Sequence, residues 1–304
     1  MNFLPFAILG YALVGGSLLI NKIQIQTRRI NPLSYTFYAG ILQGLALLLI
    51  PFGFNLNISQ EALLFAIFSG VLFVLALLFL FQSLKLTELS IVGPFVGALN
   101  PLFSLSIGVL FLNQILTTNQ LTAFFVLLFG AAVLTANLWA RKLALSRSSF
   151  AVVLSGFLFG TSYVFLREAF LQTNFINGLI ISRLSAAVFA LSILFVPKLK
   201  YQIIRINPKG SINMGQKLLF LLGQAAAGGA NLMIFFAVSL ANPALVNSLF
   251  GVQYLVILAA SLILGKNHPQ LLDENLSKGV IIQKTIGIAI LSFGVYLLST
   301  SPST

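Results

Sequence analysis

Long apolar stretches separated by short polar segments recur ten times along the 304-residue chain. Each stretch is close to the roughly 20 residues that cross a bilayer as a helix. The apolar residues are continuous and do not alternate with polar ones, which favours helices over the strands of a membrane barrel. The sequence therefore predicts an all-α integral membrane protein with ten transmembrane helices. The predicted spans are residues 3–20, 33–52, 62–84, 90–112, 121–139, 150–170, 177–196, 217–240, 244–264 and 285–299.

The overall composition agrees with this pattern. Apolar residues make up 59% of the chain and charged residues only 7%, a balance outside the range of soluble globular domains. The first stretch has no base before it and is followed by bases, so we expect a retained span and not a cleaved signal peptide. Cysteine is absent, which excludes disulfides and thiol chemistry.

The positive charge of the chain, a net +12, is distributed unevenly. Of the 17 lysines and arginines, 15 fall in or beside alternate connections, and only Arg167 and Arg183 do not. This is the positive-inside pattern, which predicts a multi-pass protein of the cell (inner or plasma) membrane with those connections in the cytoplasm and both termini outside. Anionic lipid, and not nucleic acid, is then the expected partner of the basic face. The 15 bases are Lys22, Arg28, Arg29, Lys85, Arg141, Lys142, Arg147, Lys198, Lys200, Arg205, Lys209, Lys217, Lys266, Lys278 and Lys284.

The two halves of the chain repeat one another. Gly-Gly-Ser at residues 15–17 and Gly-Thr-Ser at 160–162 each lead to a base, Lys22 or Arg167, with a constant offset of 145 residues. Residues 31–51 likewise align without a gap on 177–197, and further matches follow in the same order. Five spans per half reverse the second copy in the membrane. We expect an inverted repeat with domains at 1–140 and 148–304, and alternating access around a site near the midplane.

These residues resemble the ten-helix, EamA-like permeases of the drug/metabolite transporter superfamily. The resemblance rests on the two Gly-x-Ser stretches, on Arg183 in the seventh helix, on "SLKLTELS" at 83–90 and on "LNPLFSLSIGVLFLNQ" at 99–114. It implies transport of small metabolites such as amino acids. Three features depart from the family pattern: Gln253-Tyr254 replace a proline in the ninth helix, Phe37 aligns with Arg183, and "NQILTTNQ" lacks the usual Gly-Glu-Arg.

Arg183 is the main candidate for substrate binding, because a charge at membrane depth costs about 2.5–3.5 kcal/mol on insertion scales. It lies six residues into its span, about 9 Å from the outer end. Three roles are open. The guanidinium could extend to the outer headgroups, pair with Glu168, or bind an anionic group such as a substrate carboxylate. Arg167 lies on the outer side against the charge rule, beside Glu168, and both residues are candidates for coupling or gating.

Uncharged polar residues in the spans give further candidates for substrate binding, although hydrogen bonding between helices is the more common role for each of them. These residues are Gln82, Asn100, Tyr163, Gln224, Asn231, Asn247, Gln253 and Tyr254. Small residues are candidates for hinges or for close helix packing. They are Gly15, Gly16, Ser17, Gly160, Ser162, Gly228 and Gly229.

The five acidic residues limit the chemistry. Three lie at span ends and two in a loop, so no acid at the middle of a span is available to carry a proton. One histidine, no cysteine and no buried acid pair argue against a metal-dependent membrane enzyme, and no metal or other cofactor is expected. The sequence predicts a secondary transporter, monomeric or homodimeric, for a small polar organic solute. A channel or non-transporting sensor of the same fold is the alternative.

Overall fold

The computed structural model describes residues 2–22, 31–55, 57–86, 89–113, 116–139, 147–204, 214–264 and 278–300. Within these ranges the chain is all-α, and every predicted span falls on helical residues apart from Phe3 and Val196 at two span ends. The first half contains α1 (Leu4–Lys22), α2 (Pro32–Leu42), η2 (Gln43–Phe52), α3 (Gln60–Leu86), α4 (Leu89–Leu112) and α5 (Thr118–Trp139). The second half contains α6 (Arg147–Gln172), α7 (Phe175–Ser192), η3 (Ile193–Phe195), α8 (Pro197–Ile204), α9 (Met214–Leu240), α10 (Pro243–Ser248), η4 (Leu249–Gly251), α11 (Val252–Leu264) and α12 (Lys278–Thr300).

Seven of the described helical segments are long and apolar enough to cross a membrane. Three more apolar helices, at Thr118–Val133, Pro243–Ile257 and Ile282–Leu297, are shorter by this measure. The molecule is therefore an all-α membrane protein, and the count of ten crossings stays a prediction.

Local sequence signals explain where several helices begin and break. Asn31 and Asn242 each precede a proline, and each side chain accepts a hydrogen bond from the second residue after it, which starts α2 and α10. The ninth predicted span is not one regular helix, because residues Leu249–Gly251 form a short 3₁₀ turn between α10 and α11. Hydropathy alone does not reveal this break, since the apolar run continues through it.

Helix α8 was not predicted from the sequence, because its eight residues are too short for a span. Lys198 and Lys200 are exposed, whereas Leu199 and Ile203 lie four positions apart and pack toward the buried Leu33 and Phe37 of α2. Ser34 of α2 also donates a hydrogen bond to the carbonyl oxygen of Gln202. This amphipathic helix thus covers the side of α2.

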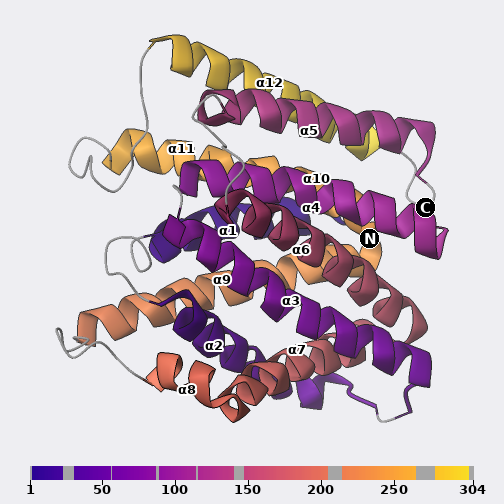
Figure 1. The fold of residues 1–304 in the computed structure, drawn as a ribbon. Helices are drawn as coiled ribbons and strands as arrows, with labels where there is room; N and C mark the ends of the chain where they lie inside the picture. Colours follow the sequence, from indigo (N-terminus) through magenta and orange to yellow (C-terminus); the bar gives the residue numbers. More distant parts are fainter. Residues whose placement is uncertain are drawn as a thin grey trace.

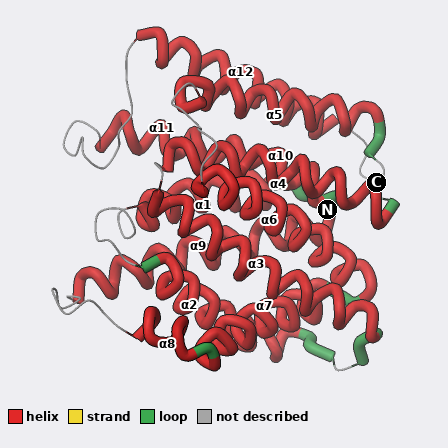
Figure 2. The backbone as a smooth tube through the Cα atoms, in the orientation of Figure 1, coloured by secondary structure: helices red, strands yellow, loops and turns green. Residues whose placement is uncertain are grey.

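The helices run roughly parallel across the molecule (Figure 1). Helices α5 and α12 pack side by side at one edge, and α2, α7 and α8 form the opposite edge. Helices α1, α3, α4, α6, α9 and α10 fill the space between them, and the backbone tube shows the same order (Figure 2). Both termini lie at one end of the helices.

The first helix of each sequence half packs against the other half. Helix α1 contacts α9 and α11, while α6 contacts α3 and α4. Both contacts are close. A Cβ atom on Gly15 would lie 2.6 Å from the carbonyl oxygen of Gln253, and one on Gly160 would lie 2.8 Å from the carbonyl oxygen of Asn100. These two glycines therefore serve close helix packing.

The remaining glycines of the predicted hinge set lie in open space. A Cβ atom on Gly16, Gly228 or Gly229 would meet no atom within 4 Å. Close packing therefore does not explain these three glycines, and their role as hinges stays a prediction.

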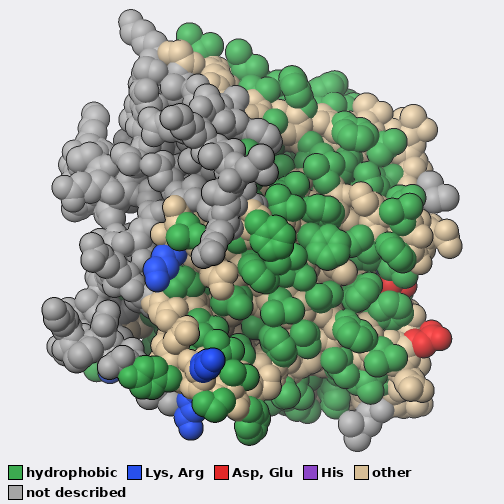
Figure 3. Space-filling model, viewed as in Figure 1, with side chains coloured by type: hydrophobic (Ala, Val, Ile, Leu, Met, Phe, Trp, Pro, Cys, Tyr) green, Lys and Arg blue, Asp and Glu red, His purple; other side chains and the backbone are tan. Residues whose placement is uncertain are grey.

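The outer surface is largely apolar, as expected for helices in contact with lipid (Figure 3). Large side chains such as Phe52, Phe111 and Phe195 are 72%, 75% and 86% exposed. On the face shown, basic side chains gather at one end of the helices and acidic ones at the other, where the termini lie. This polarity agrees with the uneven loop charge in the sequence.

Candidate functional site

Arg183 lies in the interior of the helix bundle with only 3% of its side chain exposed. Its guanidinium carbon is 4.4 Å from the ring centroid of Phe73 on α3 and 4.5 Å from that of Phe235 on α9. Nη2 donates a hydrogen bond of 2.8 Å to Ser182 Oγ, whereas the buried Nε and Nη1 have no hydrogen-bond partner. Arg183 therefore neither reaches the surface nor pairs with Glu168, two of the roles that the sequence left open.

Ser182, which holds one edge of the guanidinium, belongs to a cluster of three serines. Ser182 Oγ on α7 donates to Ser69 Oγ on α3 (3.3 Å), and Ser69 Oγ lies 3.4 Å from Ser162 Oγ on α6. Ser162 Oγ also donates to the carbonyl oxygen of Ser69 (2.8 Å). Because these serines come from three helices, their cluster ties the position of Arg183 to the packing of α3, α6 and α7.

Gly70 brings α3 and α7 together beside this serine cluster. A Cβ atom on Gly70 would lie 2.0 Å from the carbonyl oxygen of Ser182 and 2.1 Å from Ser185 Oγ. Only glycine permits this contact without a shift of backbone. Ser17, the counterpart of Ser162 in the first half, instead bonds to the carbonyl oxygen of Val14 in its own helix.

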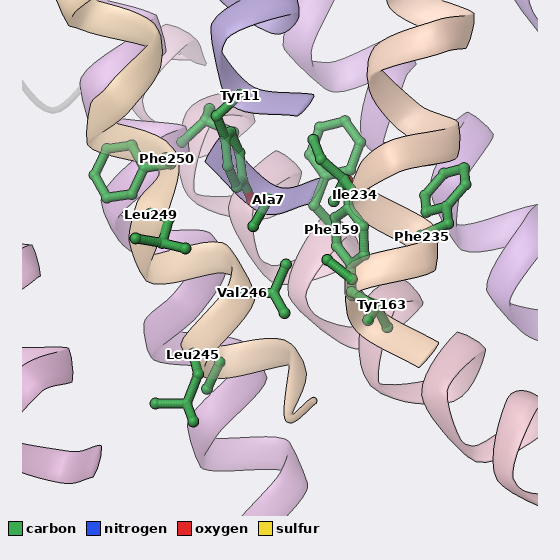
Figure 4. Packing of buried hydrophobic residues seen from close by; sticks show 14 of the residues in the cluster. Ala7, Tyr11, Phe159, Tyr163, Ile234, Phe235, Leu245, Val246, Leu249 and Phe250 are labelled. Atoms are coloured by element: carbon green, nitrogen blue, oxygen red, sulfur yellow. The ribbon is translucent and has the colours of Figure 1, made fainter. Parts of the chain in front are cut away.

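Aromatic rings surround the other side of Arg183. Phe73 packs edge-to-face on Phe159 at 5.4 Å between centroids, and Tyr163 lies 5.9 Å from Phe235. Tyr163 is buried and close enough to Arg183 to interact with it electrostatically. Figure 4 shows Phe159 and Tyr163 of α6 beside Ile234 of α9, with Tyr11 of α1 close by.

A second polar group lies next to these rings. The Tyr11 hydroxyl donates to Asn247 Oδ1 (2.9 Å), and Asn247 Nδ2 donates to Asn100 Oδ1 and Ser104 Oγ, both at 3.1 Å. Ser104 Oγ also donates to the carbonyl oxygen of Gly160 (3.3 Å). Gly160 lies two residues before Ser162 on α6, so this amide cluster and the serine cluster that holds Arg183 adjoin along one helix and form one polar centre. Helices α1, α4, α6 and α10 meet there.

The remaining predicted substrate-binding residues are Gln82, Gln224, Asn231, Gln253 and Tyr254. Gln224 bonds to the Tyr35 hydroxyl (3.3 Å), which bonds in turn to Asn21 (2.5 Å). Gln224 is 11 residues from Phe235 along α9, or about 16 Å. Gln253 and Tyr254 are buried on α11, and the Tyr254 hydroxyl has no hydrogen-bond partner. Gln82 and Asn231 are half-buried.

Arg167 has a structural contact that its sequence position did not reveal. Its Nη1 donates to the carbonyl oxygens of Val238 (3.0 Å) and Ser239 at the end of α9. The last carbonyls of a helix lack partners within it and carry partial negative charge, which a cation stabilises. Arg167 therefore caps α9, and Glu168 interacts with it electrostatically. Coupling or gating by this pair stays a prediction.

Several residues of the polar centre were not predicted from the sequence. Ser69, Ser104 and Ser182 are serines within apolar spans, where the residue type was a usable signal. Tyr11 was a similar signal in α1. For Phe73 and Phe235 no signal existed, because two of 29 phenylalanines cannot be singled out in an apolar chain.

Comparison with known proteins gives one family match and a structural likeness. Residues 3–136 match the sequence model of the EamA-like transporter family. Among solved structures, 28 chains match, including one titled only "Crystal structure of protein", which is 18% identical, covers 99% of each chain and has a TM-score of 0.64. This likeness shows that the chain shares its fold with that protein over nearly its whole length. No curated protein matches the sequence.

Proposed function

We propose that this chain, whose residues 3–136 belong to the EamA-like transporter family, is a secondary transporter that moves a small polar organic solute across the membrane by alternating access. The single observation that carries this proposal is the buried Arg183, whose Nε and Nη1 donors lack a partner among the described residues. A buried cation with free donors is costly unless a ligand completes it. An anionic group of the substrate, such as the carboxylate of an amino acid, supplies the missing acceptors.

The packing of the first helices supports an inverted repeat of two five-helix domains, 1–140 and 148–304. Gly15 and Gly160, which are equivalent in the sequence repeat, each pack on a backbone carbonyl of the opposite half, at Gln253 and Asn100. Two related halves that exchange contacts in this way can adopt two similar arrangements, one open to each side of the membrane. The site at Arg183 draws side chains from both halves.

The polar centre combines the roles that substrate binding requires. Arg183 and Tyr163 supply hydrogen-bond donors, Asn100 supplies an amide, and the aromatic rings supply an apolar wall. By contrast, Gln224 belongs to a separate group around Tyr35. We therefore propose that Gln224 holds helices together and does not bind the substrate. The uneven charge of the two ends supports a basic cytoplasmic face and external termini.

A channel or a non-transporting sensor of the same fold is the second candidate. The buried state of the site argues against a permanently open pore, because Arg183, Tyr163 and Asn247 are at most 6% exposed. A membrane enzyme is less consistent with the family match. Among the described residues, no group of three histidines, cysteines or acids could hold a metal ion.

Counterflow in proteoliposomes tests the proposal. The purified chain is reconstituted with a pool of unlabelled amino and organic acids inside, and uptake of each labelled solute is measured. We expect saturable, trans-stimulated uptake that Arg183→Ala reduces at least tenfold, while exposed Lys200→Gln leaves it unchanged. Equal uptake by Arg183→Ala at equal membrane insertion would remove Arg183 from the site, and binding without counterflow would indicate a sensor.

A further inference from the structure

The charge of Arg183 is not balanced by any acid in the described part of the chain. Of the two described acids, Glu61 lies in the first turn of α3. Glu168 lies five residues beyond Tyr163 on α6, which places it about 7.5 Å farther along the helix and about 140° around it. The charge that Glu168 faces is that of Arg167, its neighbour in the sequence. The remaining acids, Glu88, Asp273 and Glu274, fall between helices in the sequence.

The same centre offers no carboxylate to an ammonium group among the described residues. The rings of Phe73 and Phe235, which could face a cation, are already occupied by the guanidinium of Arg183. The nearby amide oxygens carry no negative charge, and each already accepts a hydrogen bond: Asn247 Oδ1 from Tyr11 and Asn100 Oδ1 from Asn247.

The free donors of Arg183 and the lack of a described anionic partner for an ammonium group together define the charge of the ligand. An amino acid would bring a carboxylate for Nε and Nη1 of Arg183, but its ammonium group would lose water without gaining an anionic partner. The ammonium group would also lie near the like charge of the guanidinium. A carboxylate without an ammonium group avoids both the lost hydration and the like-charge contact, and it neutralises the buried cation.

We propose that the preferred substrate is a net anion, namely a monocarboxylate with an apolar body and no ammonium group. This inference rests on the proposed transport function and narrows its substrate class. The carboxylate accepts hydrogen bonds from Nε and Nη1 of Arg183, and the apolar body packs against the rings of Phe159 and Tyr163. Ser182 acts as a positioning residue, because it holds Nη2 and leaves the other two nitrogens for the ligand.

Matched ligands separate the charge from the shape. The full chain is placed in lipid nanodiscs at neutral pH, and dissociation constants are measured by calorimetry for 4-methylpentanoate, leucine and isopentylamine. A second set uses 3-phenylpropanoate, phenylalanine and phenethylamine. Within each set the apolar body is constant, and only the carboxylate and the ammonium group change.

We expect at least one carboxylate to bind, and to bind at least about tenfold more tightly than its matched amino acid, equivalent to about 1.4 kcal/mol. The amine should not bind. Arg183→Gln should abolish carboxylate binding, Arg183→Lys should weaken it because the planar fork is lost, and Lys200→Gln should leave it intact. Melting curves of each variant in nanodiscs confirm that it is folded.

Several results would overturn this inference. Equal or tighter binding of an amino acid would show that its ammonium group finds an acceptor, for example at the helix break between α10 and α11. Carboxylate binding that survives in folded Arg183→Gln would contradict the assignment of the site, and binding of no carboxylate would contradict the substrate class. Counterflow of the tightest ligand is measured separately, so binding without transport would contradict the transport function and leave the ligand charge established.

Discussion

Substitution of Gly70 by alanine tests whether the close contact of α3 and α7 positions Arg183. The added Cβ would lie 2.0 Å from the carbonyl oxygen of Ser182, 2.1 Å from Ser185 Oγ and 2.9 Å from the backbone nitrogen of Ala186. Two of these atoms are backbone and cannot rotate away, so the helices must separate by about 1 Å to restore van der Waals contact. The hydrogen bond from Ser182 to Ser69 is already 3.3 Å long and would break.

The magnitude follows from two opposing effects. Overpacking of a tight interior contact costs about 1–3 kcal/mol, whereas replacement of glycine by alanine within a helix contributes about 1 kcal/mol in favour of folding. Gly279→Ala on α12 is the matched control, because its Cβ would meet no atom within 4 Å. We expect Gly70→Ala to be about 1–3 kcal/mol less stable than Gly279→Ala.

Thermal unfolding in nanodiscs and proteoliposome counterflow measure this difference. Gly70→Ala should unfold at a lower temperature than Gly279→Ala and should transport poorly even below its melting temperature, because Arg183 is displaced. If Gly70→Ala were as stable and as active as Gly279→Ala, the tight contact and its link to Arg183 would both be refuted.

Three further outcomes follow from the same contacts. Arg167→Gln removes the charged cap of α9 and should lower stability by about 1.5–3 kcal/mol without changing the order of substrate affinities; a changed order in the binding assay would place Arg167 in the site. Asn247→Ala leaves the Tyr11 hydroxyl and Asn100 without their partner and should cost about 1–3 kcal/mol, read from the melting temperature, whereas a neutral result would mean that water replaces the amide. A C-terminal reporter that is active only in the cytoplasm should be silent, and a bright signal would reverse the predicted orientation.

The helical architecture could be predicted from the sequence because bilayer thickness sets one simple requirement, a long apolar run. All predicted spans fall on helices in the described part of the chain, and the resemblance to EamA-like transporters is confirmed by the match over residues 3–136. Helix α8 and the turn at Leu249–Gly251 were not predicted. An eight-residue helix is too short for a span, and a local change of hydrogen-bond pattern leaves the mean hydropathy almost unchanged.

The site was harder to predict because its members come from distant segments. The sequence marked Arg183 as costly but left its direction open, and only the packing of Phe73 and Phe235 against it decides for the interior. Gln224 was a candidate for substrate binding from its polar type, and the structure adds its hydrogen bond to Tyr35, so its role in binding stays a prediction. Residue type and depth identify candidates, but the neighbours that decide their roles depend on the tertiary fold.

The central claim, that the site at Arg183 opens alternately to the two sides of the membrane, can be tested by cysteine labelling. The chain has no cysteine, so Ser162→Cys introduces the only thiol, and no other residue reacts with the label. Ser162 belongs to the serine cluster that holds Arg183. Membrane-impermeant maleimide is applied from either side of oriented vesicles that contain the active variant. Alternating access predicts labelling from both sides, with carboxylate ligand slowing both reactions. Labelling from one side only, or labelling from both sides that no ligand affects, would contradict the account.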